Sequence, residues 1–212
     1  DTRYSFLPNF SEIVNRLPEE PGFIIVVDSG DYERTGSVLQ GLEPDLVIDH
    51  HATNPHFGRI NLVETDTEAC ALVLENHIPN WGLSIDKPVA ECLLTGILAD
   101  TIGFRTANVK PDCLNAAARL MEAGADLPRI YQKVLLARSY SELLYWGQGL
   151  SKLKLENGLV WTSLSLADRA VAQYPSGDDA DLVNNLTIID GMQIAVIFVE
   201  QGLEHTKVSW RA

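Results

Sequence analysis

The chain has 212 residues, 46% of them hydrophobic, and a formal charge of −13 at pH 7. This length and composition suit one large domain or two small ones, and no run of about 18 apolar residues predicts a transmembrane helix. The negative charge argues against a broad surface for long nucleic acids, but it is compatible with a short nucleotide held by a metal ion and a few local cations.

The first half of the chain contains two short β-branched runs, 22–30 and 44–51, that end in polar residues and predict buried strands. The segment between them, 31–44, has room for a short helix. Residues 65–68 (Thr-Asp-Thr-Glu) have capping-box spacing, which predicts a helix over about 66–78.

Three further helical patterns follow, and the second of them is closed by Gly124 at a position that favours glycine: 86–99, 111–123 and 127–150. From about residue 152 the pattern changes to a hairpin with Asn157-Gly158 as its turn, then a short helix over 166–173 and two strands.

Alternating strands and helices predict an α/β fold, in which a parallel-sheet domain is followed by a smaller α+β domain. We expect the first domain to cover residues 1–140, a linker helix to cover 141–151, and the second domain to cover 152–212.

Ionisable side chains follow the predicted strands. Asp28 ends the first strand, and Asp49, His50 and His51 end the second. Ligands of open α/β sheets bind beyond the carboxyl ends of the strands, so we expect these groups at one edge, with Asp100 added by a later apolar segment. Two carboxylates and an imidazole suit Mn²⁺ or Mg²⁺ better than a metal that prefers thiolates.

Each of these residues also has an ordinary explanation when it is taken alone. Asp28 is typical of a turn, Asp100 of a helix end, and adjacent histidines of a solvated strand end. Their joint order and placement favour the metal site. The three cysteines are far apart, form no C-x-x-C motif and predict reduced core residues of a cytoplasmic protein.

Three motifs carry a resemblance to a known family: VVDSGD, VIDHH and GILADTIGFRTAN. With these spacings the chain resembles the DHH phosphoesterases, and within them the DHH/DHHA1 type that degrades short oligoribonucleotides and dephosphorylates 3′-phosphoadenosine 5′-phosphate. The segment that begins VNNLTIIDGMQIAVIFVEQ resembles the start of the DHHA1 substrate-binding domain.

The resemblance implies roles for individual residues. Asp28 corresponds to a carboxylate that bridges two Mn²⁺ ions, and His50 and Asp100 correspond to ligands of one of them. Asp49 would orient the histidine, and His51 would stabilise charge on the scissile phosphate.

Soon after Asp100, Arg105 and Asn108 are candidates for contact with the substrate, and a guanidinium there would make a charge-assisted contact to phosphate.

Two family motifs are missing from these residues. One is the first metal motif, His-x-x-x-Asp-x-Asp, and the other is a glycine-rich motif that ends in His. We therefore expect the chain to be part of a longer protein and, by itself, unable to hold both metal ions. A protein that truly began at Asp1 would be a degenerate binding module.

The resemblance favours a Mn²⁺-dependent enzyme that hydrolyses short oligoribonucleotides or nucleotide 3′-phosphates, with Mg²⁺ as the alternative ion. A cyclic dinucleotide phosphodiesterase and a non-catalytic nucleotide-binding module stay open as alternatives. We expect a small nucleotide substrate, no membrane, no long duplex nucleic acid and a cytoplasmic location. A homodimer stays open.

Overall fold

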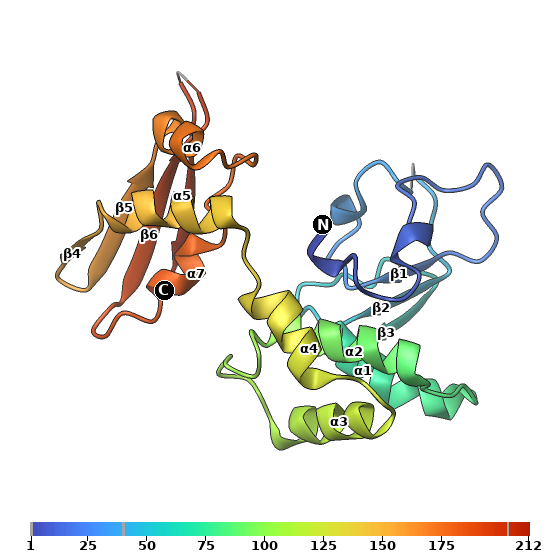
Figure 1. The fold of residues 1–212 in the computed structure, drawn as a ribbon. Coiled ribbons are helices and arrows are strands. Elements are labelled where there is room, and N and C mark those ends of the chain that lie inside the picture. The colour runs from blue at the N-terminus through green and yellow to red at the C-terminus, as the bar shows by residue number, and fades with distance from the viewer. Residues whose placement is uncertain (1, 40, 203) are drawn as a thin grey trace. The chain divides into compact units, whose positions relative to one another are not determined.

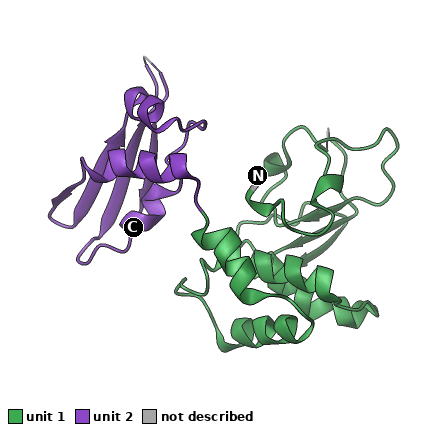
Figure 2. Cartoon of the chain, in the orientation of Figure 1, with its two compact units in different colours: residues 1–137 green, residues 138–212 purple. Residues whose placement is uncertain are grey.

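The computed structural model describes residues 2–39, 41–202 and 204–212, and it divides into two compact units, Asp1–Ala137 and Arg138–Ala212 (Figures 1 and 2). Each unit has its own sheet and its own hydrophobic core. No helix of the described residues is long and apolar enough to cross a lipid bilayer.

The first unit contains a three-stranded parallel sheet in the order β1-β2-β3: Ile25–Val27, Leu46–Asp49 and Ile60–Val63. The two predicted strands are present in shorter form, whereas β3 lies in a segment for which no strand was predicted. The helix predicted within 31–44 is a short 3-10 turn, Glu33–Thr35, and Gln40 of that segment lies outside the described residues.

Four α-helices complete the first unit: α1 (Cys70–His77), α2 (Lys87–Asp100), α3 (Pro111–Glu122) and α4 (Leu127–Tyr131). Helix α1 contacts β2 and α2, and α2 contacts α3 and α4. The core lies mainly between these helices, where successive turns of α2 bury Leu94, Ile97 and Leu98. The three-stranded sheet thus rests on α1, and α2 is the central helix of the unit.

The structure tests where the predicted helices begin and end. Helix α3 ends as predicted, because Gly124 has φ +105° and the amides of Gly124 and Ala125 bond back to Met121 and Leu120. The prediction of a capping box at 65–68 is wrong. Helix α1 begins at Cys70 after Ala69, and the Glu68 carboxylate instead accepts a hydrogen bond from Lys110 N.

The prediction of a single helix over 127–150 is also wrong. The segment is divided into α4, a π-helical turn (Gln132–Leu136) and α5 (Tyr140–Leu150). Ser139 provides a capping box that starts α5 afresh, because its hydroxyl accepts from Glu142 N and the Glu142 carboxylate accepts from Ser139 N.

The second unit contains a four-stranded mixed sheet in sequential order: β4 (Lys154–Glu156), β5 (Leu159–Leu164), β6 (Ile194–Glu200) and β7 (Thr206–Arg211). The predicted hairpin is present, and Asn157 and Gly158 have φ of 50° and 81°. Helices α5, α6 (Leu166–Ala172) and α7 (Leu182–Leu186) pack with this unit, and no helix was predicted where α7 lies. The α/β fold class, with a parallel sheet followed by a smaller α+β unit, is confirmed.

An ion pair between a buried carboxylate and an arginine whose side chain is 53% exposed ties α1 to α3. The Glu75 carboxylate belongs to a residue that is only 5% exposed, and both of its oxygens accept from Arg119 at 2.7 Å. A carboxylate at this depth needs a partner, since its charge is poorly solvated.

We therefore expect Arg119→Ala to lower the free energy of unfolding by about 2 kcal/mol, because it leaves the Glu75 carboxylate buried without its partner. The control is Arg59→Ala, which breaks a pair with the more exposed carboxylate of Asp45 (18% exposed, with its arginine 66% exposed), and it should cost less than about 1 kcal/mol. Urea unfolding with an unchanged m-value measures both. Equal losses for the two variants would contradict the argument from carboxylate burial.

Candidate metal centre

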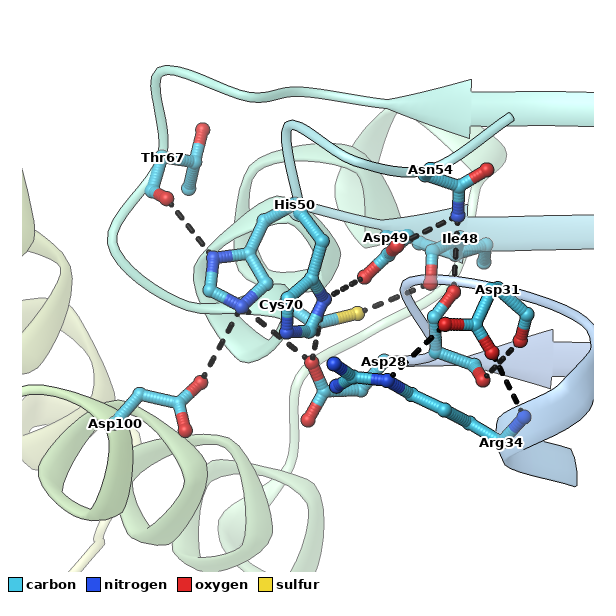
Figure 3. A network of polar contacts seen from close by, with 12 residues as sticks. Asp28, Asp31, Arg34, Ile48, Asp49, His50, Asn54, Thr67, Cys70 and Asp100 are labelled. Carbon is cyan, nitrogen blue, oxygen red and sulfur yellow. Dashed lines mark hydrogen bonds and ion pairs between the residues drawn. The ribbon is translucent and has the colours of Figure 1, made fainter. Parts of the chain in front are cut away.

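The motif residues lie together because β1 and β2 are parallel neighbours. Val27 pairs with Ile48, and the Asp28 amide continues the ladder by donating to Ile48 O at 3.0 Å. Asp28 therefore lies beside the end of β2, where Asp49 is followed by the two histidines. The C-terminal residue of α2, Asp100, approaches the same edge (Figure 3).

The imidazole of His50 faces two carboxylates. Its Nδ1 lies 3.0 Å from the Thr67 carbonyl oxygen, which can only accept, so Nδ1 carries a proton and donates it. Its Nε2 lies 3.5 Å from Asp28 Oδ1 and 3.8 Å from Asp100 Oδ2. Once its proton is displaced, Nε2 would offer a lone pair to a cation between the carboxylates, which is the arrangement that a metal-bound histidine requires.

The charges at this edge are strongly coupled in the absence of a metal. The contact with Asp28 raises the pKa of His50 to about 9, against the opposing effect of burial. Burial, followed by the neighbouring charge of Asp28, raises the pKa of the Asp100 carboxyl above its usual range. A divalent cation would relieve the repulsion between the two acids and would take the place of the proton on His50.

Asp49 contacts the ring of His51 and not that of His50, which it was expected to orient. Asp49 is fully buried. Its Oδ1 lies 2.7 Å from His51 Nδ1, and its Oδ2 accepts a hydrogen bond from Asn54 Nδ2 at 2.6 Å. Burial raises the pKa of Asp49, but the hydrogen bonds from Asn54 and His51 outweigh it and lower the pKa overall.

Ligand atoms of Asp28, Asp49, His50 and His51 all lie within 4.8 Å of one another. The Asp49 oxygens are already occupied, so Asp100 is the better candidate for a metal ligand.

Two backbone features support this arrangement. Asp28 has φ 57°, a left-handed conformation that is uncommon for residues other than glycine and occurs often at functional sites. Gly30 approaches His51 so closely that a Cβ there would lie 3.3 Å from both Cβ and Cγ of His51. The turn after β1 is therefore shaped around the side chains at the end of β2.

The structure also locates Arg105 and Asn108, which were predicted as substrate contacts, and two contact residues that were not predicted. Arg105 and Asn108 are exposed in the loop after α2, and no hydrogen bond or ion pair joins them to the cluster in the described part of the chain. Asn54 and Thr67 were not singled out from the sequence. Thr67 contributes a backbone oxygen, which no side-chain motif can reveal. For Asn54 the sequence offers one weak signal of a role in the site, namely that it follows the histidine pair closely.

The candidate ligand group of the described residues contains no cysteine. Cys70 lies beneath the site, donates through Sγ to Ile48 O at 3.2 Å, and has its pKa raised to about 12 by burial. Cys113 is buried as expected, whereas Cys92 is exposed, contrary to the prediction of a core residue; all three are free.

Cation binding at this site should depend on pH. Below a pKa of about 9 an ion must displace the proton from His50, so affinity should rise from pH 6.5 towards 9, by up to about tenfold per pH unit. Isothermal titration in two buffers of different ionisation enthalpy would count the proton released per ion. His50→Gln should abolish this dependence. An affinity for the wild-type protein that stays constant over the range would contradict the proposed ligand.

Comparisons with known proteins agree with the fold and the motifs. No family model matches the chain. It is 33% identical over 212 residues to the bifunctional oligoribonuclease and PAP phosphatase NrnA of Thermus thermophilus, an alignment that covers 98% of this chain and 63% of the relative. The chain thus spans less than two thirds of that relative.

A probable manganese-dependent inorganic pyrophosphatase of Shouchella clausii is 24% identical over 116 residues, which cover 52% of this chain and 36% of the relative. An exopolyphosphatase-related protein from Bacteroides fragilis has the same fold, with a TM-score of 0.91 at 23% identity over 100% of this chain and 67% of that one. These likenesses agree with the resemblance of the chain to the DHH/DHHA1 phosphoesterases, which its Asp-Ser-Gly-Asp, Asp-His-His and Ala-Asp-Thr motifs indicated.

Proposed function

We propose that this protein is a metal-dependent phosphoesterase that hydrolyses short oligoribonucleotides and nucleotide 3′-phosphates. The observation that carries the proposal is the position of His50 Nε2, which faces Asp28 and Asp100 at 3.5 and 3.8 Å while Thr67 fixes the other ring nitrogen. The name of the Thermus relative supports the substrate class, and that of the Shouchella relative supports Mn²⁺.

The donor set fits a hard or borderline divalent ion. Asp28, His50 and Asp100 offer two carboxylates and one imidazole, which suit Mn²⁺, with Mg²⁺ as the alternative. When bound, a pair of such ions would supply a nucleophilic water at neutral pH and charge stabilisation for the phosphoryl oxygens. Asp28 lies near both histidines, 3.5 Å from His50 and 3.9 Å from His51, and it would hold the ion together with His50 and Asp100.

His51 would act on the substrate. Asp49 binds Nδ1 at 2.7 Å, so the ring is fixed and Nε2 is the nitrogen left for a phosphate oxygen. Asn54 holds Asp49 from the other side, at 2.6 Å, and its amide also donates to Ser29 O at 3.0 Å. With both ring nitrogens protonated, His51 would thus be held ready to donate a hydrogen bond from Nε2 to charge that develops on the phosphate.

The overall charge of −13 is compatible with a small substrate that is bound at a single site. A long duplex would need many phosphate contacts from lysine and arginine. The free cysteines agree with a reducing compartment, and we keep a cytoplasmic location as part of the proposal. The homodimer likewise stays a prediction.

The proposal is tested by thermal unfolding and by turnover of full-length protein. Saturating Mn²⁺ should raise the melting temperature relative to EDTA, because an ion that binds only the native state stabilises it by about 2.7 kcal/mol at 100 times Kd. Mn²⁺ should also support release of mononucleotides from a diribonucleotide, with cyclic dinucleotides as competing substrates. Equal melting curves, or preferred cleavage of cyclic dinucleotides, would contradict the proposal.

The two histidines should be separable by mutation. His50→Ala should lose Mn²⁺ affinity and activity together. His51→Ala should keep Mn²⁺ affinity within about threefold but slow single-turnover cleavage about 100- to 1000-fold, since it removes one donor to the transition state. Parallel Mn²⁺ titrations and single-turnover assays measure the contrast, with His56→Ala as a neutral exposed control. The roles are wrong if both variants lose metal equally.

A further inference from the structure

The loop over residues 101–110, between α2 and α3, begins with strained backbone. Ile102, Gly103 and Phe104 all have positive φ, at 49°, 69° and 67°. The amides of Ile102 and Gly103 bond back to Ala99 O and Leu98 O, which closes α2 in a motif that normally has glycine where Ile102 stands. A β-branched residue in this conformation costs energy and persists only where its surroundings enforce it.

Neighbouring groups enforce the positive φ angles of residues 102–104. Thr101 is fully buried, and its hydroxyl accepts from Phe104 N at 3.0 Å while donating to Ile97 O. A Cβ at Gly103 would lie 2.7 Å from the ring of Tyr131, so this position has no room for any other residue. The loop therefore leaves α2 in a fixed direction directly after Asp100.

The far end of the loop is held by the segment that also orients His50. Glu68 is 6% exposed, and its Oε1 accepts from Lys110 N at 2.7 Å. The Lys110 ammonium donates to Asp66 O at 2.7 Å and pairs with the Asp66 carboxylate. Between these two contacts lies Thr67, whose carbonyl accepts from His50 Nδ1.

We propose that Glu68 is a positioning residue for substrate, because it fixes loop 101–110 relative to the metal centre. Arg105 and Asn108 are exposed in this loop. Both ends of the loop are held beside the proposed metal site: Thr101 follows the candidate ligand Asp100, and Glu68 follows Thr67, whose carbonyl orients His50. An apolar side chain at position 68 would avoid burying a carboxylate, so the contact to Lys110 explains the residue type. The inference rests on the proposed function, since it takes Arg105 and Asn108 as contacts to the substrate phosphate.

The test compares Glu68→Ala with Glu68→Gln in full-length protein, with 5′-phosphorylated diadenylate as substrate. Glu68→Ala should raise KM about tenfold, the value of one charge-assisted contact, with kcat within about threefold and Mn²⁺ affinity within about twofold. Glu68→Gln should restore KM, because an amide oxygen also accepts the Lys110 amide. Hydrogen exchange of residues 101–110 should speed up in Glu68→Ala and stay slow in Glu68→Gln.

A second variant covers the case in which Glu68→Ala does not fold. Lys110→Met removes the contacts to Asp66 from a side chain that is 44% exposed, and it should raise KM two- to threefold with faster exchange in the loop. Lys133→Met, at an exposed position in the same unit, should change neither quantity. Faster exchange without a change in KM, or no change in either, would overturn the inference while leaving the proposed function intact. Failure of the wild-type protein to cleave the dinucleotide would overturn both.

Discussion

The parallel pairing of β1 with β2 is the interaction on which the rest of the site depends. It is short, with three pairs of residues and one further bond from Asp28 N to Ile48 O, yet it fixes where the two motifs meet. A slip of one residue would turn Asp49 from the buried face of the sheet to the other side. The fully buried Asp49 and the half-exposed Asp28 are thus consequences of one register.

Around this pairing the molecule builds two separate supports. One runs through side chains: Asn54 and Asp49 hold His51. The other runs through the segment 66–68, in which the Thr67 carbonyl holds His50 while the Glu68 carboxylate and the Asp66 carbonyl hold Lys110 at the end of the loop after α2. The proposed ligand and the proposed phosphate-facing group are neighbours in sequence, but their orientations are fixed independently.

The sequence predicted the parts of this arrangement that follow from local pattern. Apolar runs that end in Asp28 and Asp49 indicated strand ends, and parallel strands must bring such ends to one edge. Their roles as ligands stay predictions. The sequence could not indicate Thr67, since a backbone oxygen leaves no trace in residue type, or the bond from Glu68 to Lys110, which joins residues 42 apart. The break after Leu136 was missed because the apolar periodicity continues through it, and only the cap at Ser139 marks the new start.

The two supports also differ in how they tolerate change over evolutionary time. A backbone carbonyl is present whatever the side chain at position 67, so drift at that position leaves the ring of His50 oriented. His51 depends on the carboxylate of Asp49 and the amide of Asn54, and only a narrow set of residues can replace either. If His50 binds the metal and His51 acts on the phosphate as proposed, relatives that keep metal binding but lose phosphoester hydrolysis would therefore arise most readily by substitution at positions 49 and 54.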